Sequence, residues 1–137
     1  MATARTLKQK IHYRIARANS DVFLPKEFRD LGGEDQVLRV LRGMVSTGEL
    51  MKLGYGVYAK AVRSSLTGRL MVNSDNGFNG AARQALTKLG VPWEPSSSER
   101  AYNEGRSTQI PVTPMVRVKG RFHRKLSDGR TELRIER

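Results

Sequence analysis

The 137-residue sequence has no cysteine, so disulfide bonds and thiolate metal sites are excluded. It has only two histidines, His12 and His123, and neither an HExxH pattern nor a phosphate-binding glycine loop. Three glutamates (Glu94, Glu99 and Glu104) lie near one another in the sequence, but their spacing does not mark a carboxylate cluster of the kind that holds Mg²⁺. We therefore expect a protein that is not an enzyme and that needs no metal and no cofactor.

Long apolar runs are also missing. No stretch approaches the roughly eighteen apolar residues of a transmembrane helix, and the first residues lack the apolar region of a signal peptide. A helix on a membrane surface would need bulky apolar residues opposite a basic face. The first predicted helix comes closest, but its stripe of Leu7, Ile11 and Ile15 is more typical of a helix that faces a core. We expect a cytoplasmic protein without a membrane partner.

Acidic residues are scarce, with 13 Asp and Glu against 25 Lys and Arg, which gives a formal net charge of +12. The excess is spread evenly, because residues 1–65 and residues 66–137 each carry a net charge of +6. A disordered basic tail would concentrate the charge at one end. The charge therefore predicts a polyanionic partner that both halves of the chain face.

The first half of the chain has the element order of a winged helix-turn-helix. Apolar spacing predicts helices over residues 6–18 and 25–31, and a third helix from residue 34 to Gly48. The period then changes, and two short strands over 50–53 and 57–59 are predicted to form a hairpin whose glycines take positive φ angles. We assign residues 1–61 to this predicted DNA-binding domain.

The second half predicts a small α/β lobe over residues 62–137. A strand is expected within 66–72 and a helix over 79–89, followed by an irregular loop at 91–98 and extended chain at 108–114. Alternating apolar and basic residues then predict a β-hairpin from Val116 to Ile135, turning at residues 127–130, with one basic side. The predicted fold class is α+β, with an N-terminal winged helix and a C-terminal lobe that ends in this hairpin.

The third helix is the predicted reading helix, because arginine and glutamine hydrogen-bond base edges in the major groove. The alternative is that this side of the third helix is an ordinary solvated face with no ligand. The hairpin tip is the predicted wing, which contacts backbone rather than bases, and the first helix adds phosphate candidates. Tyr58 is expected to face the core. The predicted DNA-binding residues are Gln36, Arg39, Arg42 and Ser46 on the third helix, Lys52 and Tyr55 at the wing, and Lys8, Lys10 and Arg14 on the first helix.

A second basic surface is predicted on the C-terminal hairpin, where no acidic residue occurs from Met115 to Ser127. Such a surface suits flanking DNA phosphates, structured RNA or an acidic protein partner; the alternative is an edge strand that charge protects from aggregation. Its predicted members are Arg117, Lys119, Arg121, Arg124 and Lys125.

Several short motifs resemble the AbiEi-type antitoxins of abortive-infection systems. In the N-terminal half these are Leu24-Pro25-Lys26-Glu27-Phe28, Leu31-Gly32, Val37 to Leu41, Gly48-Glu49-Leu50 and Gly56-Val57-Tyr58. The most specific is the string Arg106-Ser107-Thr108-Gln109-Ile110-Pro111, and the stretch from Val116 to Ile135 resembles the basic strand pair of that family. The loop from Glu99 to Gly105 departs from the family, in which a more apolar run is expected.

The resemblance implies a winged-helix repressor that binds promoter repeats of its own operon. It also implies a type IV system, in which a nucleotidyltransferase-like toxin is counteracted without a stable complex. Two other functions fit the same basic surfaces: an RNA-binding or processing-complex module, and a protein-interaction adaptor for an acidic partner. The leading prediction is sequence-specific binding to double-stranded DNA. The oligomeric state is left open between a monomer and a weak dimer.

Overall fold

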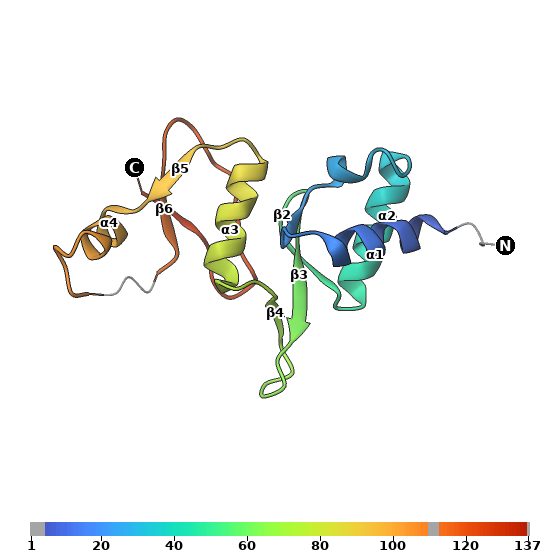
Figure 1. The fold of residues 1–137 in the computed structure, drawn as a ribbon, viewed down its shortest axis with the longest axis horizontal. Coiled ribbons are helices and arrows are strands. Elements are labelled where there is room, and N and C mark those ends of the chain that lie inside the picture. Colours follow the sequence, from blue (N-terminus) through green and yellow to red (C-terminus); the bar gives the residue numbers. More distant parts are fainter. Residues whose placement is uncertain (1–4, 110–112, 137) are drawn as a thin grey trace.

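The computed structural model describes residues 5–109 and 113–136 (Figure 1). These residues form an α+β fold, which confirms the predicted fold class at that level. The helical elements are α1 (Leu7–Arg17), the 3₁₀ turn η1 (Pro25–Phe28), α2 (Glu34–Ser46), α3 (Gly77–Lys88) and α4 (Ser97–Asn103). The strands are β1 (Val22–Phe23), β2 (Leu50–Gly54), β3 (Val57–Arg63), β4 (Leu70–Val72), β5 (Trp93–Pro95), β6 (Met115–Val118) and β7 (Arg134–Glu136).

A small antiparallel sheet lies between two helical layers. Its strands follow the order β1-β3-β2, and β4 pairs with the far end of β3. Helices α1 and α2 lie on one side and α3 on the other (Figure 1). Alternation along β3 serves both layers, because Tyr58 joins the core beneath α1 and α2 whereas Val57 and Ala59 join the core beneath α3.

The α1–α2 layer follows the predicted apolar stripes. Ile11 and Ile15 of α1 pack with a buried stripe of α2 formed by Val37, Leu41 and Met44. A capping box starts α1: the Gln9 N–H donates to Thr6 Oγ1 at 3.2 Å, and the Thr6 N–H donates to Gln9 Oε1 at 2.9 Å. The first and third predicted helices are therefore confirmed.

The predicted second helix is shorter than expected. Instead of residues 25–31, only the four residues Pro25–Phe28 are helical, and as a 3₁₀ turn. The Glu27 side chain accepts a 2.7 Å hydrogen bond from the Leu24 N–H, which fixes the start of the turn. The chain then continues through turns to Gly32 and Gly33 before α2 begins.

The C-terminal lobe is built around α3. Ala81, Ala82, Ala85 and Leu86 pack against the central sheet, so the helix predicted over 79–89 is confirmed at 77–88. The loop predicted at 91–98 is wrong in part, because Trp93–Pro95 is strand β5 and pairs with β6. Part of the extended segment predicted at 108–114 lies outside the described residues.

The predicted C-terminal β-hairpin is wrong. Strands β6 and β7 pair in parallel, with Val116 opposite Ile135, whereas a hairpin requires antiparallel pairing. The reason is the burial of Phe122 and Leu126, which draws the connecting chain across to the β2–β3 hairpin before it returns. A parallel pair needs such a long crossover. Only a local turn remains of the prediction, bridged between Ser127 and Glu132.

The two halves of the chain share one of the two cores. The cluster beneath α3 includes Val22, Leu53 and Val57 together with Leu86 and Val116. The predicted domain boundary at residue 61 therefore stays a prediction about function, because buried contacts join residues on both sides of it. Within the described residues, none of the helices combines the length and apolar character that a membrane span requires.

Candidate nucleic-acid interface

The outward face of α2 carries the predicted reading residues. Gln36, Arg39, Arg42 and Ser46 are all exposed, opposite the buried stripe of the same helix. Within the described part of the chain, the Arg39 and Arg42 guanidinium groups make no hydrogen bond and no ion pair. The Ser46 hydroxyl donates to the Arg42 carbonyl oxygen at 3.2 Å and is thus turned toward its own helix. The two arginines are the groups on this face that a ligand can engage most directly.

The β2–β3 hairpin presents Tyr55 at its tip, with 86% of that residue exposed. The Lys52 ammonium group lies 5.9 Å from the centroid of the Tyr55 ring, a cation–π distance. Tyr58 is 2% exposed, which confirms its predicted place in the core. Of the two glycines at the tip, only Gly56 has a positive φ, so the predicted positive φ at Gly54 is wrong. A glycine is required at position 54 because the backbone of Lys125 lies close to it.

The three predicted phosphate-binding residues on α1 differ in their contacts. Lys8 and Lys10 are exposed, but Arg14 donates two 2.7 Å hydrogen bonds to the Asp30 carboxylate and a third to the Glu27 carbonyl oxygen. Hydrogen bonding between the two side chains raises the pKa of Arg14 and lowers the pKa of Asp30. Arg14 therefore joins α1 to the turn after η1, a role that sequence spacing did not indicate.

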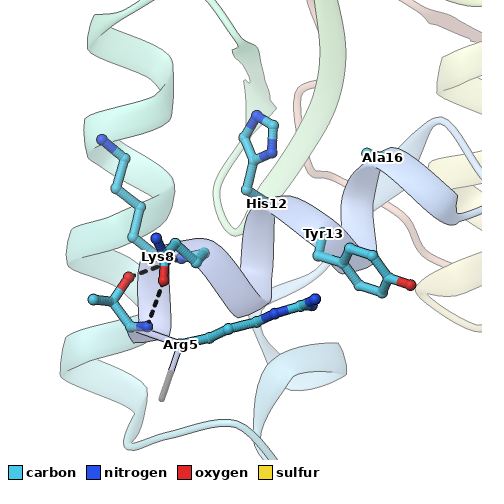
Figure 2. Close-up of a pocket in the computed structure, with 7 residues that line it drawn as sticks. Arg5, Lys8, His12, Tyr13 and Ala16 are labelled. Carbon is cyan, nitrogen blue, oxygen red and sulfur yellow. Dashed lines mark hydrogen bonds between the residues drawn. The ribbon is translucent and has the colours of Figure 1, made fainter. Parts of the chain in front are cut away.

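The exposed side of α1 also lines an open pocket of about 750 Å³ (Figure 2). Two guanidinium groups lie near the Tyr13 ring, with the Arg5 Cζ atom 4.7 Å and the Arg17 Cζ atom 5.2 Å from the ring centroid. His12 lies 3.2 Å from a carboxylate oxygen of Glu49. These side chains largely engage other residues, which leaves Lys8 as the basic residue of this pocket that makes no hydrogen bond and no ion pair within the described part of the chain.

The second predicted basic surface is divided by the fold. Arg117 lies on the middle strand of its sheet, opposite Glu94 on β5 and Glu136 on β7, and its Nε atom is 4.0 Å from Glu94. Two carboxylates thus flank this arginine and neutralise part of its charge. The other four members, Lys119, Arg121, Arg124 and Lys125, are exposed on the crossover between β6 and β7.

The crossover segment, residues 119–126, is docked on the β2–β3 hairpin. Leu126 is 1% exposed within the shared core, and the next residue, Ser127, donates its N–H to the Leu53 carbonyl oxygen at 2.8 Å. A Cβ built on Gly54 would lie 2.6 Å from the Lys125 carbonyl oxygen, so the two backbones are in direct contact. The Arg124 guanidinium donates to the Tyr55 carbonyl oxygen at the hairpin tip. The segment is therefore held against the predicted wing.

These contacts place residues of both predicted surfaces around one groove of about 330 Å³. Its apolar floor includes Leu24, Leu38 and Tyr58, and its rim is strongly basic. The five basic lining residues are Lys26, Arg29, Arg42, Lys52 and Arg124, against a single acidic residue, Glu34. Sequence reasoning missed Lys26 and Arg29, because the short turn that carries them has no periodicity to indicate which way a side chain points.

Within the described ranges, no group of three or more His, Asp or Glu side chains is placed to hold a metal ion. Comparison of the chain with protein-family models, with curated proteins and with solved structures finds no match. What indicates the function is therefore the geometry and charge of these surfaces.

Proposed function

We propose that the chain is a transcriptional repressor that binds double-stranded DNA in a sequence-specific manner, with its N-terminal half acting as a winged helix-turn-helix. The order of elements supports the proposal: α1, β1, the short η1 turn, α2 and then the β2–β3 hairpin, with β1 paired to β3. In that arrangement α2 enters the major groove and the hairpin lies against the adjacent backbone.

The observation that carries the proposal is a pair of arginines on α2 that have no partner among the described residues. Arg39 and Arg42 project from a helix whose opposite face is buried, so their backbone positions are fixed while their side chains are available. Arginine binds the O6 and N7 atoms of guanine with two hydrogen bonds, the commonest specific contact in the major groove. Tyr55 and Lys52 at the neighbouring hairpin supply contacts that position the protein on the duplex.

An antitoxin role is the finer form of this proposal. It is favoured by the resemblance of the N-terminal motifs and of the Arg106 to Gln109 string to AbiEi-type antitoxins; Ile110 and Pro111 of that string lie outside the described residues. In this form the protein binds repeats in the promoter of its own operon and acts against a nucleotidyltransferase-like toxin without forming a stable complex with it.

The test is selection of random DNA duplexes, followed by binding measurements on the enriched sequence and on a scrambled one. We expect Arg39→Ala and Arg42→Ala each to reduce the discrimination between the two duplexes by about 1–3 kcal/mol. Arg121→Ala should weaken binding to both duplexes equally, and Arg69→Ala, on the loop beyond the far end of β3, should leave binding unchanged.

Three results would contradict the proposal. If selection enriches no sequence and structured RNA binds more tightly than any duplex, the basic surfaces serve RNA instead. If the protein binds neither nucleic acid at low salt, the adaptor function for an acidic protein remains. Equal effects of all α2 and crossover variants on both duplexes would show that α2 does not read bases.

A further inference from the structure

We propose that the groove between η1, α2 and the hairpin tip holds one backbone phosphate of the bound duplex, contacted by Lys52 and Arg124. The inference rests on the proposed function and extends it: the crossover segment, residues 119–126, belongs to the same DNA interface as α2 and is not a second, separate surface. The sequence places Arg124 more than sixty residues from the hairpin, and only the fold brings it there.

Charge is the first argument for a phosphate. The groove lining has five basic residues and one acidic residue, a net charge of +4 around about 330 Å³. Its floor is apolar, and a low local dielectric strengthens the attraction between the rim cations and an anion. The two proposed ligands come from β2 and from the crossover, so they approach the groove from separate elements.

The donors that would contact the phosphate are held in place before binding. The Arg124 guanidinium uses Nη2 to bond the Tyr55 carbonyl oxygen, and its other N–H groups remain available for an anion. The Lys52 ammonium lies over the Tyr55 ring. Both ligands are thus organised by the residue at the hairpin tip, which reduces the entropy lost on binding.

The crossover behind Arg124 is anchored, which separates it from a basic tail. Leu126 is buried with Leu53, the Ser127 N–H bonds the Leu53 carbonyl oxygen, and the Lys125 carbonyl oxygen lies against Gly54. Arg124 therefore has a fixed position relative to Lys52. A cation held at a fixed position can contact one particular phosphate on every bound duplex.

The experiment measures the affinity of the full-length chain for its selected duplex and for a scrambled duplex over a range of salt concentrations. Removal of one phosphate contact lowers the magnitude of the negative slope of log affinity against log salt concentration by about 0.9. We expect Arg124→Gln to make the slope less steep by about that amount and to weaken binding to both duplexes by about fivefold at moderate salt. Arg124→Lys should restore part of the loss. The matched control, Arg69→Gln, should change neither quantity.

A second variant removes a negative charge from the groove, so it should change the affinity in the opposite direction. Glu34 is the one acidic residue of the lining, so Glu34→Gln should raise the affinity for both duplexes by about twofold or more at low salt. The control is Glu104→Gln, which removes an exposed carboxylate at the end of α4. Thermal unfolding of each variant establishes that binding is compared between folded proteins.

The outcomes separate this inference from the proposed function. If the wild type binds its selected duplex but Arg124→Gln keeps the full salt slope and affinity, the phosphate site is wrong while the DNA-binding function stands. The same holds if Glu34→Gln and Glu104→Gln have equal effects. If the wild type binds no duplex at all, both are wrong.

Discussion

Gly54 lies where the β2–β3 hairpin meets the C-terminal crossover. A Cβ at this position would lie 2.6 Å from the Lys125 carbonyl oxygen and 3.2 Å from a methyl carbon of Leu126. The obstacle is backbone, which cannot move aside as the end of a flexible side chain can. The glycine is therefore required by contact with a distant part of the chain and not by its own φ angle.

We predict that Gly54→Ala lowers the free energy of unfolding by about 1–3 kcal/mol, because the added methyl group overpacks the hairpin against the crossover. Chemical denaturation measures the change. Gly43→Ala is the matched control: Gly43 is exposed within α2, has open space around its Cβ position, and should gain about 0.5–1 kcal/mol from higher helix propensity. An equal effect of the two substitutions would contradict the close contact at Gly54.

At the scale of elements, the position of α1 depends on one ion pair as well as on its apolar stripe. Arg14 binds both carboxylate oxygens of Asp30 and the Glu27 carbonyl oxygen, which joins α1 to η1 and to the turn that precedes α2. A planar guanidinium and a carboxylate form such paired hydrogen bonds in a defined orientation. The pair thus links α1 to the turn before α2 through hydrogen bonds of defined geometry.

The hydrogen bonds from Arg14 lower the pKa of Asp30, so the pair makes stability depend on pH. A carboxylate whose pKa is lower in the folded state stabilises the protein above its unfolded pKa of about 4, and this contribution is lost as the pH falls through the folded pKa. We predict that Asp30→Asn is less stable than the wild type at pH 7 and that the difference shrinks as the pH falls below about 4.

Denaturant unfolding at a series of pH values measures this difference. The comparison with Asp30→Asn is necessary because Glu136 also has a lowered pKa, owing to hydrogen bonds from the Ser97 hydroxyl and N–H, and it destabilises both proteins alike in acid. A stability difference that stays constant from pH 7 to strongly acidic conditions would contradict the proposed contribution of the pair.

At the scale of the whole molecule, the central sheet couples the two halves of the chain. Val22, Leu53, Val57 and Ala59 contribute their side chains to the core beneath α3. An ion pair also joins the two halves: the Nζ atom of Lys88 on α3 lies 2.7 Å from a carboxylate oxygen of Glu27 on η1. A chain cut at residue 61 would leave the α3-facing side of the sheet exposed to water.

We therefore predict that the protein unfolds in a single cooperative transition and that residues 1–61 alone do not form a stable fold. Far-UV circular dichroism follows all helices, while the fluorescence of the single tryptophan, Trp93, follows the C-terminal lobe. The two denaturation curves should coincide. Separate midpoints, or a folded fragment 1–61 with a cooperative melt, would show that the halves are independent domains.

The sequence by itself determined the periodic elements. The stripes of Ile11 and Ile15 in α1 and of Leu41 and Met44 in α2 specify helices because the spacing that buries one face is local to each segment. The same holds for the β2–β3 hairpin, where the break in period and the glycines stand within one short stretch. Exposure of Arg39 and Arg42 follows from the same periodicity, since they lie opposite the buried stripe.

Only the tertiary structure decided which strands and charges meet. The alternation after Val116 is equally compatible with a hairpin and with the parallel pair that forms, because period two reports a buried face and not a partner. Likewise, nothing near Arg14, Arg117 or Arg124 indicates that they face Asp30, Glu94 and the hairpin tip. Such partners lie on different segments of the chain, and in the case of Arg124 the packing of Phe122 and Leu126 holds the crossover against the hairpin.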